Sequence, residues 1–163
     1  MIHNGIFTFK HYRQGKLIDI QQAKNGVTNL GAHLILDGIF NGGSIPANWY
    51  LGLIGNTGYT FLSNIDTMAS HSGWIEYTSY AGNRKSYTTI AAASRRVTNS
   101  VSKGVFVFST LGVIRGAFLT TDVTKGGTAG TLLSTSLLGG NGNAGALSLV
   151  VSDEIELEYD VYY

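Results

Sequence analysis

Half of the ten acidic residues of this chain fall in one short segment, and carboxylates are the side chains here best suited to chemistry. Two carboxylates that face one cleft can hydrolyse a glycosidic bond, provided that burial keeps one of them protonated. Several carboxylates together can also bind Ca²⁺, which prefers oxygen ligands, although no calcium-binding loop is evident in this sequence. The five acids of the segment are Asp153, Glu154, Glu156, Glu158 and Asp160.

The spacing of these acids favours a surface role over catalysis. Four of them alternate with apolar residues, so on a β-strand they share one face and are ionised and solvated. Two interpretations remain open for that face. The segment is a solvated or edge strand whose charges prevent unwanted pairing, or it is a stripe that docks on a basic surface. In both, the opposite strand face, with Ile155, Leu157, Tyr159 and Val161, is expected to point into the core.

Basic residues form a second candidate surface. Two pairs, Arg84-Lys85 and Arg95-Arg96, fall in or beside a long glycine- and serine-rich segment, and four more cations belong to the first thirty residues. A basic cluster near Tyr87 is a weak indication of nucleic-acid binding, but the net charge of +1 and the lack of interleaved aromatic residues argue against it. We therefore expect pairing with acidic groups of a neighbouring subunit. The candidate interface residues are Arg84, Lys85, Arg95, Arg96, Glu154, Glu156, Glu158 and Asp160.

Other catalytic and metal-binding patterns are missing from the sequence. The histidines (His3, His11, His33 and His71) have no zinc-binding spacing, and there is no cysteine. No phosphate-binding or dinucleotide-binding glycine motif and no nucleophile motif occurs. Among the remaining acids only Asp66 and Glu76 lie near the long loops, and nothing in the sequence indicates that they converge. We expect no enzyme activity, no metal and no cofactor.

The composition is typical of a protein whose surface is largely in contact with other proteins. Charged residues make up only 13% of the chain and hydrophobic residues 44%, with a mean hydropathy of +0.11. A surface built from uncharged polar groups costs less to desolvate than an ionic one. No run of roughly 18 to 20 apolar residues is long enough for a membrane span, and the first residues lack the pattern of a signal peptide. We expect synthesis in the cytoplasm and no membrane partner.

The elements that would position these residues are mostly strands. Alternation and turn residues predict an N-terminal hairpin within 1–25 and further strands across 48–163, rich in glycine turns. One helix is expected near 28–41, capped by Thr28 and ended by Gly42-Gly43. Residues 55–73 and 80–96 are expected to be long loops. The pattern predicts a single all-β domain over 1–163, a jelly-roll-like β-sandwich of about eight to ten short strands.

Five stretches of the chain, in their order and spacing, resemble a family of structural proteins from tailed phages. The resemblance covers residues 27–163, and it departs at Leu30, where a Glu is expected, and in the first hairpin, which has no recognised counterpart. The stretches are VTNLG at 27–31 (continuing to Gly42-Gly43), NWYLGL at 48–53, GWIEYTSY at 73–80, VIRGAFL at 113–119 and KGGTAGTLL at 125–133.

The resemblance implies a jelly-roll module, and some such modules cover the joints between capsid subunits. The expected function is therefore that of a capsid cement (decoration) protein on the virion surface, made in the host cytoplasm, which bridges subunits of the major capsid protein and self-associates as a dimer or trimer. The alternative is a tail-fibre or tail-associated module that binds a receptor glycan, with Trp49, Trp74 and tyrosines stacking on sugar rings.

Overall fold

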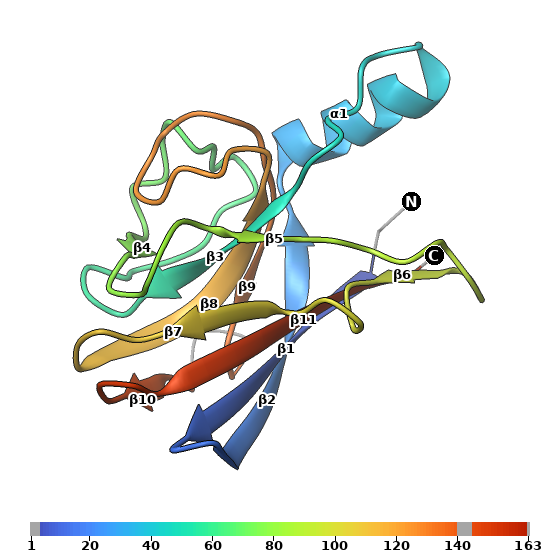
Figure 1. Cartoon of the computed structure of the whole chain (residues 1–163). Coiled ribbons are helices and arrows are strands. Elements are labelled where there is room, and N and C mark those ends of the chain that lie inside the picture. The colour runs from blue at the N-terminus through green and yellow to red at the C-terminus, as the bar shows by residue number, and fades with distance from the viewer. Residues whose placement is uncertain (1–3, 140–144, 163) are drawn as a thin grey trace.

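The computed structural model describes residues 4–139 and 145–162, which form eleven strands and a single helix (Figure 1). The helix, α1, covers Asn29–Phe40. The strands are β1 (Asn4–Arg13), β2 (Lys16–Val27), β3 (Tyr50–Gly55), β4 (Glu76–Tyr77), β5 (Lys85–Ser86), β6 (Arg96–Thr98), β7 (Gly104–Val107), β8 (Gly112–Thr120), β9 (Leu132–Leu137), β10 (Leu147–Leu149) and β11 (Glu154–Tyr162).

All strand pairs are antiparallel, and β2 joins the two layers of the sandwich. The first part of β2 pairs with β1, whereas Asn25–Val27 pairs with β9 in the other layer. One layer therefore runs β2-β1-β11 and is extended by β6 and β7. The other runs β9-β8-β3, with β4 and β5 on β3 and β10 on β8. The all-β, sandwich-like fold predicted from the sequence is confirmed.

The core lies between the two layers. Phe7 and Phe9 of β1 and Leu157 of β11 are fully buried against residues of β3 and β8, among them Leu53 and Leu119. On β11 the expected alternation holds for Ile155, Leu157 and Tyr159, which are buried, while Val161 is only half-buried. Away from β2, backbone bonds between 79–81 and 107–109 join the layers again, with Ala81 N–H donating to the Val107 carbonyl at 3.0 Å.

The hairpin and the helix begin and end where the sequence indicates. Gln14 and Gly15 both have positive φ (50° and 73°), as a two-residue hairpin turn requires. The Thr28 hydroxyl accepts the N–H of Gly31 at 3.0 Å, and the helix ends before Gly42, whose φ is +67°. Gly31 is also the buried residue of α1, because it packs directly on the backbone of Leu133 in β9.

Two local predictions are wrong. The segment 80–96 is not one loop, since it contains β5. β11 is not an edge strand, because it pairs with β1 along its length and with β6 and β7 on its other side. The edge interpretation failed because short partner strands such as β6 carry little alternation of their own.

Candidate functional site

The acidic stripe lies on the outer face of the layer β2-β1-β11, in a setting of mixed charge. Glu156 lies opposite Lys10 on β1 and opposite Val105 on β7. Its carboxylate is 3.5 Å from Lys103 Nζ, and it accepts a hydrogen bond from the Tyr12 hydroxyl at 3.4 Å. The stripe is therefore partly neutralised within the chain, and the interpretation of a row of fully solvated charges is wrong at Glu156.

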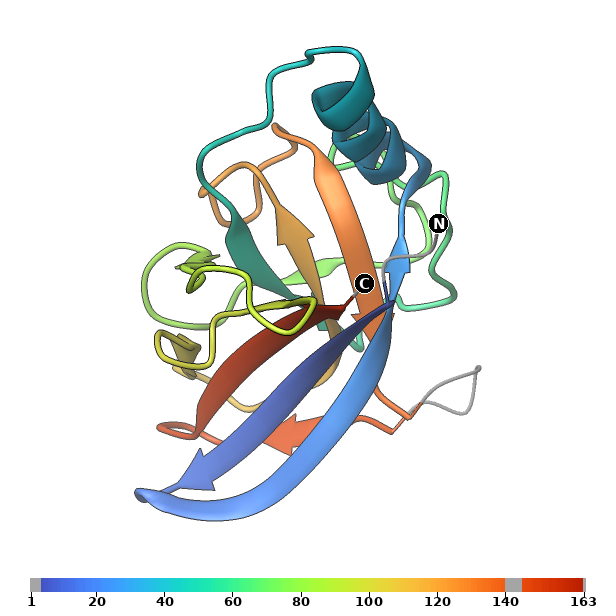
Figure 2. The same cartoon turned by 90° about the vertical axis from the view of Figure 1, so that its right-hand side faces the viewer.

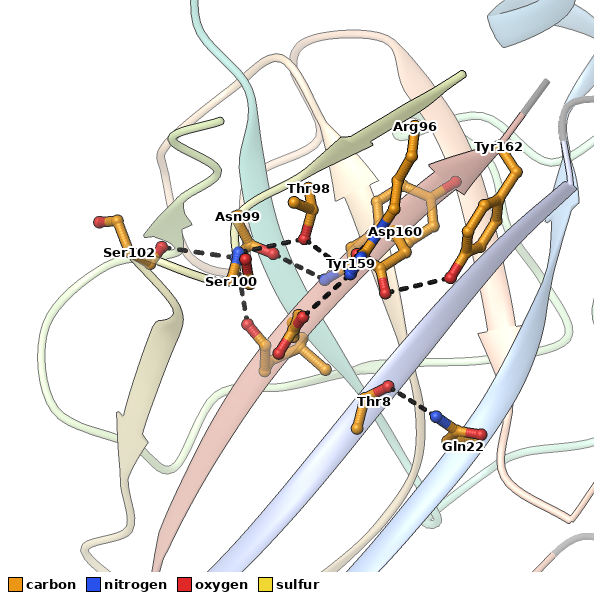
Figure 3. Close-up of polar contacts among 12 residues, drawn as sticks. Thr8, Gln22, Arg96, Thr98, Asn99, Ser100, Ser102, Tyr159, Asp160 and Tyr162 are labelled. Atoms are coloured by element: carbon orange, nitrogen blue, oxygen red, sulfur yellow. Dashed lines mark hydrogen bonds and ion pairs between the residues drawn. The ribbon is translucent and has the colours of Figure 1, made fainter. Parts of the chain in front are cut away.

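Arg96 meets the C-terminal end of the same stripe (Figure 3). Its Nε and Nη2 atoms donate to Asp160 Oδ1 at 3.0 and 2.6 Å, and Nη2 lies 3.5 Å from Glu158. The hydrogen bonds that Arg96 donates to Asp160 raise the pKa of Arg96. Asp160 is itself buried and also accepts a hydrogen bond from Tyr162. The structure thus brings Arg96, Glu158 and Asp160 together, although the sequence indicated pairing between subunits rather than within one.

Asn99, which the sequence did not single out, completes the ladder of β11 between β6 and β7 (Figure 3). Its side-chain amide accepts the Tyr159 N–H at 2.7 Å and donates to the Leu157 carbonyl at 3.2 Å. The amide takes the place of a strand residue here, because Glu158 and Tyr159 pair with no residue of β6 or β7. A single side-chain amide that hydrogen-bonds to a strand backbone produces no alternation in the sequence, so this role of Asn99 could not be predicted.

Arg84 is not part of a surface, which corrects the prediction for this residue. Its side chain is fully buried and forms a two-pronged ion pair with Glu76, with Nε–Oε1 at 3.0 Å and Nη2–Oε2 at 2.7 Å. It also donates to the carbonyls of Asp122 and Gly127, while Gly126 N–H donates to Glu76. The sequence around Arg84 does not distinguish a buried arginine from an exposed one, because the groups that accept its hydrogen bonds lie 8 to 43 residues away along the chain.

Lys85 and Arg95 lie apart from these pairs. Lys85 donates to the carbonyl of Ala81 at 2.7 Å, and burial together with the nearby Lys125 lowers its pKa. Arg95 is exposed and adopts a positive φ of 62° in the turn before β6. Of the candidate interface residues, Arg95 and the half-exposed Glu154 remain open to a partner, whereas Arg84 does not.

A second buried ionic cluster fixes the turn before β11. Asp153 is fully buried, and its carboxylate accepts two hydrogen bonds from Arg13 at 2.8 Å and lies 2.7 Å from His11 Nε2. It also accepts the N–H of Val150 at 3.0 Å. The Arg13 hydrogen bonds, aided by those of Val150 and His11, hold the pKa of Asp153 well below its usual range despite its burial. The sequence placed Asp153 in the acidic segment but did not separate it from the exposed acids.

The acid Asp66 also has structural partners. Its carboxylate accepts the indole N–H of Trp74 at 2.9 Å and the N–H of Ser63 at 3.0 Å, which ties the loop between β3 and β4 to the core. Trp74 is buried, and His71 stacks on it with ring centres 3.9 Å apart. Trp74 therefore does not present its ring to a sugar, which corrects that part of the glycan-binding hypothesis.

Trp49, the other tryptophan, lies at an open cavity of about 450 Å³. Tyr50 and Tyr87 line this cavity as well, and the Tyr87 hydroxyl donates to the carbonyl of Tyr159 at 3.0 Å. The remaining lining is uncharged and mostly polar, with Ala47, Asn48, Ser86, Thr88, Thr89 and Val97. Aromatic rings beside amide and hydroxyl groups are suited to an uncharged, polyhydroxylated ligand.

Several large apolar side chains are exposed on α1, which leads away from the sandwich (Figures 1 and 2). Phe40 is 68% exposed and Ile39 58%, and Leu30 and Leu36 are also exposed. A helix that carries apolar side chains on so much of its surface is normally covered by protein. The sequence indicated the helix and its ends but did not reveal that its last residues, Ile39 and Phe40, would be exposed.

Within the described residues, no group of three or more acids and histidines is arranged to hold a metal ion, and no helix is long and apolar enough to cross a membrane. His3 lies outside the described residues. A scan against protein-family models found no match to this chain, and a search of curated proteins found none either.

Proposed function

We propose that this chain is a non-enzymatic structural protein of a tailed-phage virion, a capsid cement protein that bridges subunits of the major capsid protein. The observation that carries the proposal is the exposed apolar helix α1 on an otherwise self-contained sandwich. A surface of this kind needs a protein partner, since exposed apolar patches mark interaction sites. The resemblance to phage structural proteins is the reason for proposing a capsid protein as that partner.

The charged groups support a structural role. Glu76, Asp66 and Asp153 are buried acids, and each is fully engaged with a structural partner: Arg84, Trp74 and Arg13, respectively. A general acid needs a free proton facing a cleft, and a nucleophile needs a base beside it. We expect only background hydrolysis of glycans, esters and peptides. A turnover that disappears with Asp66→Asn, in a variant that still folds, contradicts the proposal.

The outer face of the layer β2-β1-β11 is a further surface for the capsid. Val105 and Val107 are exposed beside the acidic stripe, so apolar and charged groups alternate there. Many modest contacts of this kind suffice for a cement protein, because a symmetric shell repeats them many times. Binding at the joints between capsid subunits would add buried area that resists internal pressure.

Particles that lack the protein provide the direct test. Purified protein added to such particles is expected to bind to the capsid at a fixed ratio to the major capsid protein and to raise the temperature at which DNA is released. Particles whose release temperature is unchanged, or binding only to tails, would contradict a cement function. Bovine serum albumin at equal concentration controls for nonspecific protection.

A second candidate, a glycan-binding module of the tail, is supported by the cavity at Trp49. The combination of Trp49, Tyr50 and Tyr87 with hydroxyl and amide groups suits a saccharide. Titration of host-surface polysaccharide fragments, followed by tryptophan fluorescence, distinguishes the two functions. A saturable change that Trp49→Ala abolishes would favour the tail, and no change up to millimolar concentration would leave the cement function as the better account.

A further inference from the structure

A groove of about 650 Å³ lies at the base of α1, on the outer face of the second layer. Strand residues of β2 and β9, including Gly26 and Leu137, form one side, and the loop with Phe61 and Leu62 forms the other. Gly26 leaves open space above the strand, since nothing lies within 4 Å of where a side chain would begin. Phe61 is 51% exposed at the groove. The groove can therefore receive bulky apolar side chains.

The helix beside the groove offers such side chains. Leu36, Ile39 and Phe40 follow i, i+3, i+4 spacing and so share one side of α1, and all three are exposed. The chain's own helix leads away from its own groove. Its base is fixed, because Thr28 N–H donates to the Leu133 carbonyl at 3.0 Å and Asn29 N–H to the Asn64 carbonyl at 2.7 Å. The side chains of Leu36, Ile39 and Phe40 are therefore left uncovered within the chain.

The charges of helix and groove are complementary. Asp37 is the single residue of α1 that is charged at neutral pH, and it is exposed on the same half of the helix as Phe40. Lys24 is the single charged residue among the described residues that line the groove, and it is exposed as well. One acid on an apolar helix and one base at a groove of mixed polar and apolar lining favour one direction of docking over the other.

We propose that α1 of one copy docks in the Lys24–Phe61 groove of a second copy of this chain, with Phe40 inserted above Gly26 and Asp37 paired with Lys24. The inference deepens the self-association expected for the proposed function and rests on it, but it concerns free protein and needs no capsid. A reciprocal exchange gives a two-fold dimer, and a head-to-tail exchange gives a closed ring.

Sedimentation velocity of the isolated protein across micromolar concentrations tests this docking. Wild-type protein is expected to associate, and Phe40→Ser to weaken association by about tenfold or more, as loss of a central aromatic anchor does. Leu111→Ser is the matched control, because Leu111 is 72% exposed but lies in the turn before β8, away from helix and groove. Circular dichroism verifies that each variant is folded.

An exchange of charges gives the sharper result. Asp37→Lys alone and Lys24→Asp alone are each expected to weaken association severalfold, and the double variant to restore it, because the pair is then reversed. A lysine near the C-terminal end of α1 interacts favourably with the helix dipole, although Asp37→Lys removes the hydrogen bond that Asn41 donates at 2.8 Å. Circular dichroism therefore verifies that each charge variant keeps its helix.

The first three results that overturn the proposal concern the wild type and the charge variants. They are a wild-type protein that stays monomeric, single charge variants that associate like wild type, and a double variant that fails to recover. If Phe40→Ser leaves association unchanged but abolishes binding to particles, α1 docks on the capsid instead, and the self-docking is wrong while the cement function stands. If association follows the proposal and particle binding is never seen, the docking stands and the cement function fails.

Discussion

The sandwich and the helix α1 differ in how far their side chains are covered by the rest of the chain. In the sandwich, buried ions have partners within the chain, as Arg84 has Glu76 and Asp153 has Arg13, and large apolar side chains such as Leu157 are covered. On α1, Ile39 and Phe40 are exposed. A region whose apolar side chains are buried and whose ions are paired within the chain contributes to folding stability. A region with large exposed apolar side chains is a candidate site for contact with another molecule. Substitutions in the two regions should therefore change different measurements.

The largest difference should appear between Leu157→Asp and Phe40→Asp. Leu157 is fully buried, so the variant loses core burial and places an unpaired carboxylate in the core, at a cost of about 5 kcal/mol in the free energy of unfolding. Phe40→Asp should lower that free energy by about 1 kcal/mol or less, because the side chain is exposed and a carboxylate at the C-terminal end of α1 opposes the helix dipole only weakly. Urea titrations measure both. If Leu157→Asp is tolerated and Glu156→Gln unfolds the protein, the face assignment of β11 is wrong.

The buried pair Arg84–Glu76 should give the next largest effect. Glu76→Gln leaves the buried arginine charge with only the longer contact to Asp122 at 3.7 Å, which costs about 3 kcal/mol in the free energy of unfolding. The matched control is Glu158→Gln, which loses a longer, partly exposed contact with Arg96 and should cost no more than about 1 kcal/mol. Equal losses in the two variants would mean that Arg84 is solvated and that the cluster does not fix the loops.

Asp153 should make the stability of the sandwich depend on pH in the acid range. Its pKa is lower in the folded protein than in the unfolded chain, where an aspartate titrates near about 4. The ionised form therefore favours folding. This contribution is fully present above about pH 4 and is lost as the pH falls through the folded-state pKa. Thermal melts from pH 2 to 7 should show a steeper acid loss for wild type than for Asp153→Asn. Curves that fall in parallel would contradict the assignment.

The smallest effect on folding is expected for Glu156 and Glu158, the partly exposed acids of the stripe. The double variant Glu156→Gln with Glu158→Gln should lower the free energy of unfolding by about 1 kcal/mol or less, since both ion pairs are long and partly exposed. If the stripe docks on a basic capsid surface, the same variant should bind particles more weakly and with less dependence on salt. Binding that is unchanged at every salt concentration would remove the stripe from the interface.

Patterns among neighbouring residues predicted most of the longer strands and the helix. Contacts between residues far apart along the chain could not be predicted from the sequence. Alternation placed Leu157 in the core, and Thr28 with Gly42 marked the helix ends, because each signal is confined to a few neighbouring residues. The ion pair between Arg84 and Glu76 could not be predicted, since nothing in sequence distinguishes a buried arginine from an exposed one.

The candidate interface shows the same limit. Arg96 lies more than sixty residues from Asp160 in sequence, and only the pairing of β6 with β11 brings them together. The exposure of Phe40 was equally hidden, because an apolar stripe on a helix has the same spacing whether its own chain or another molecule covers it.

A reconstruction of the intact phage particle at side-chain resolution tests the central claim most directly, because it shows both where the protein lies and what covers α1. The account predicts density for this sandwich on the capsid surface, across joints between major capsid subunits, with Phe40 buried against a neighbouring copy. Density confined to the tail, or a capsid-bound sandwich whose α1 extends into solvent, would contradict it.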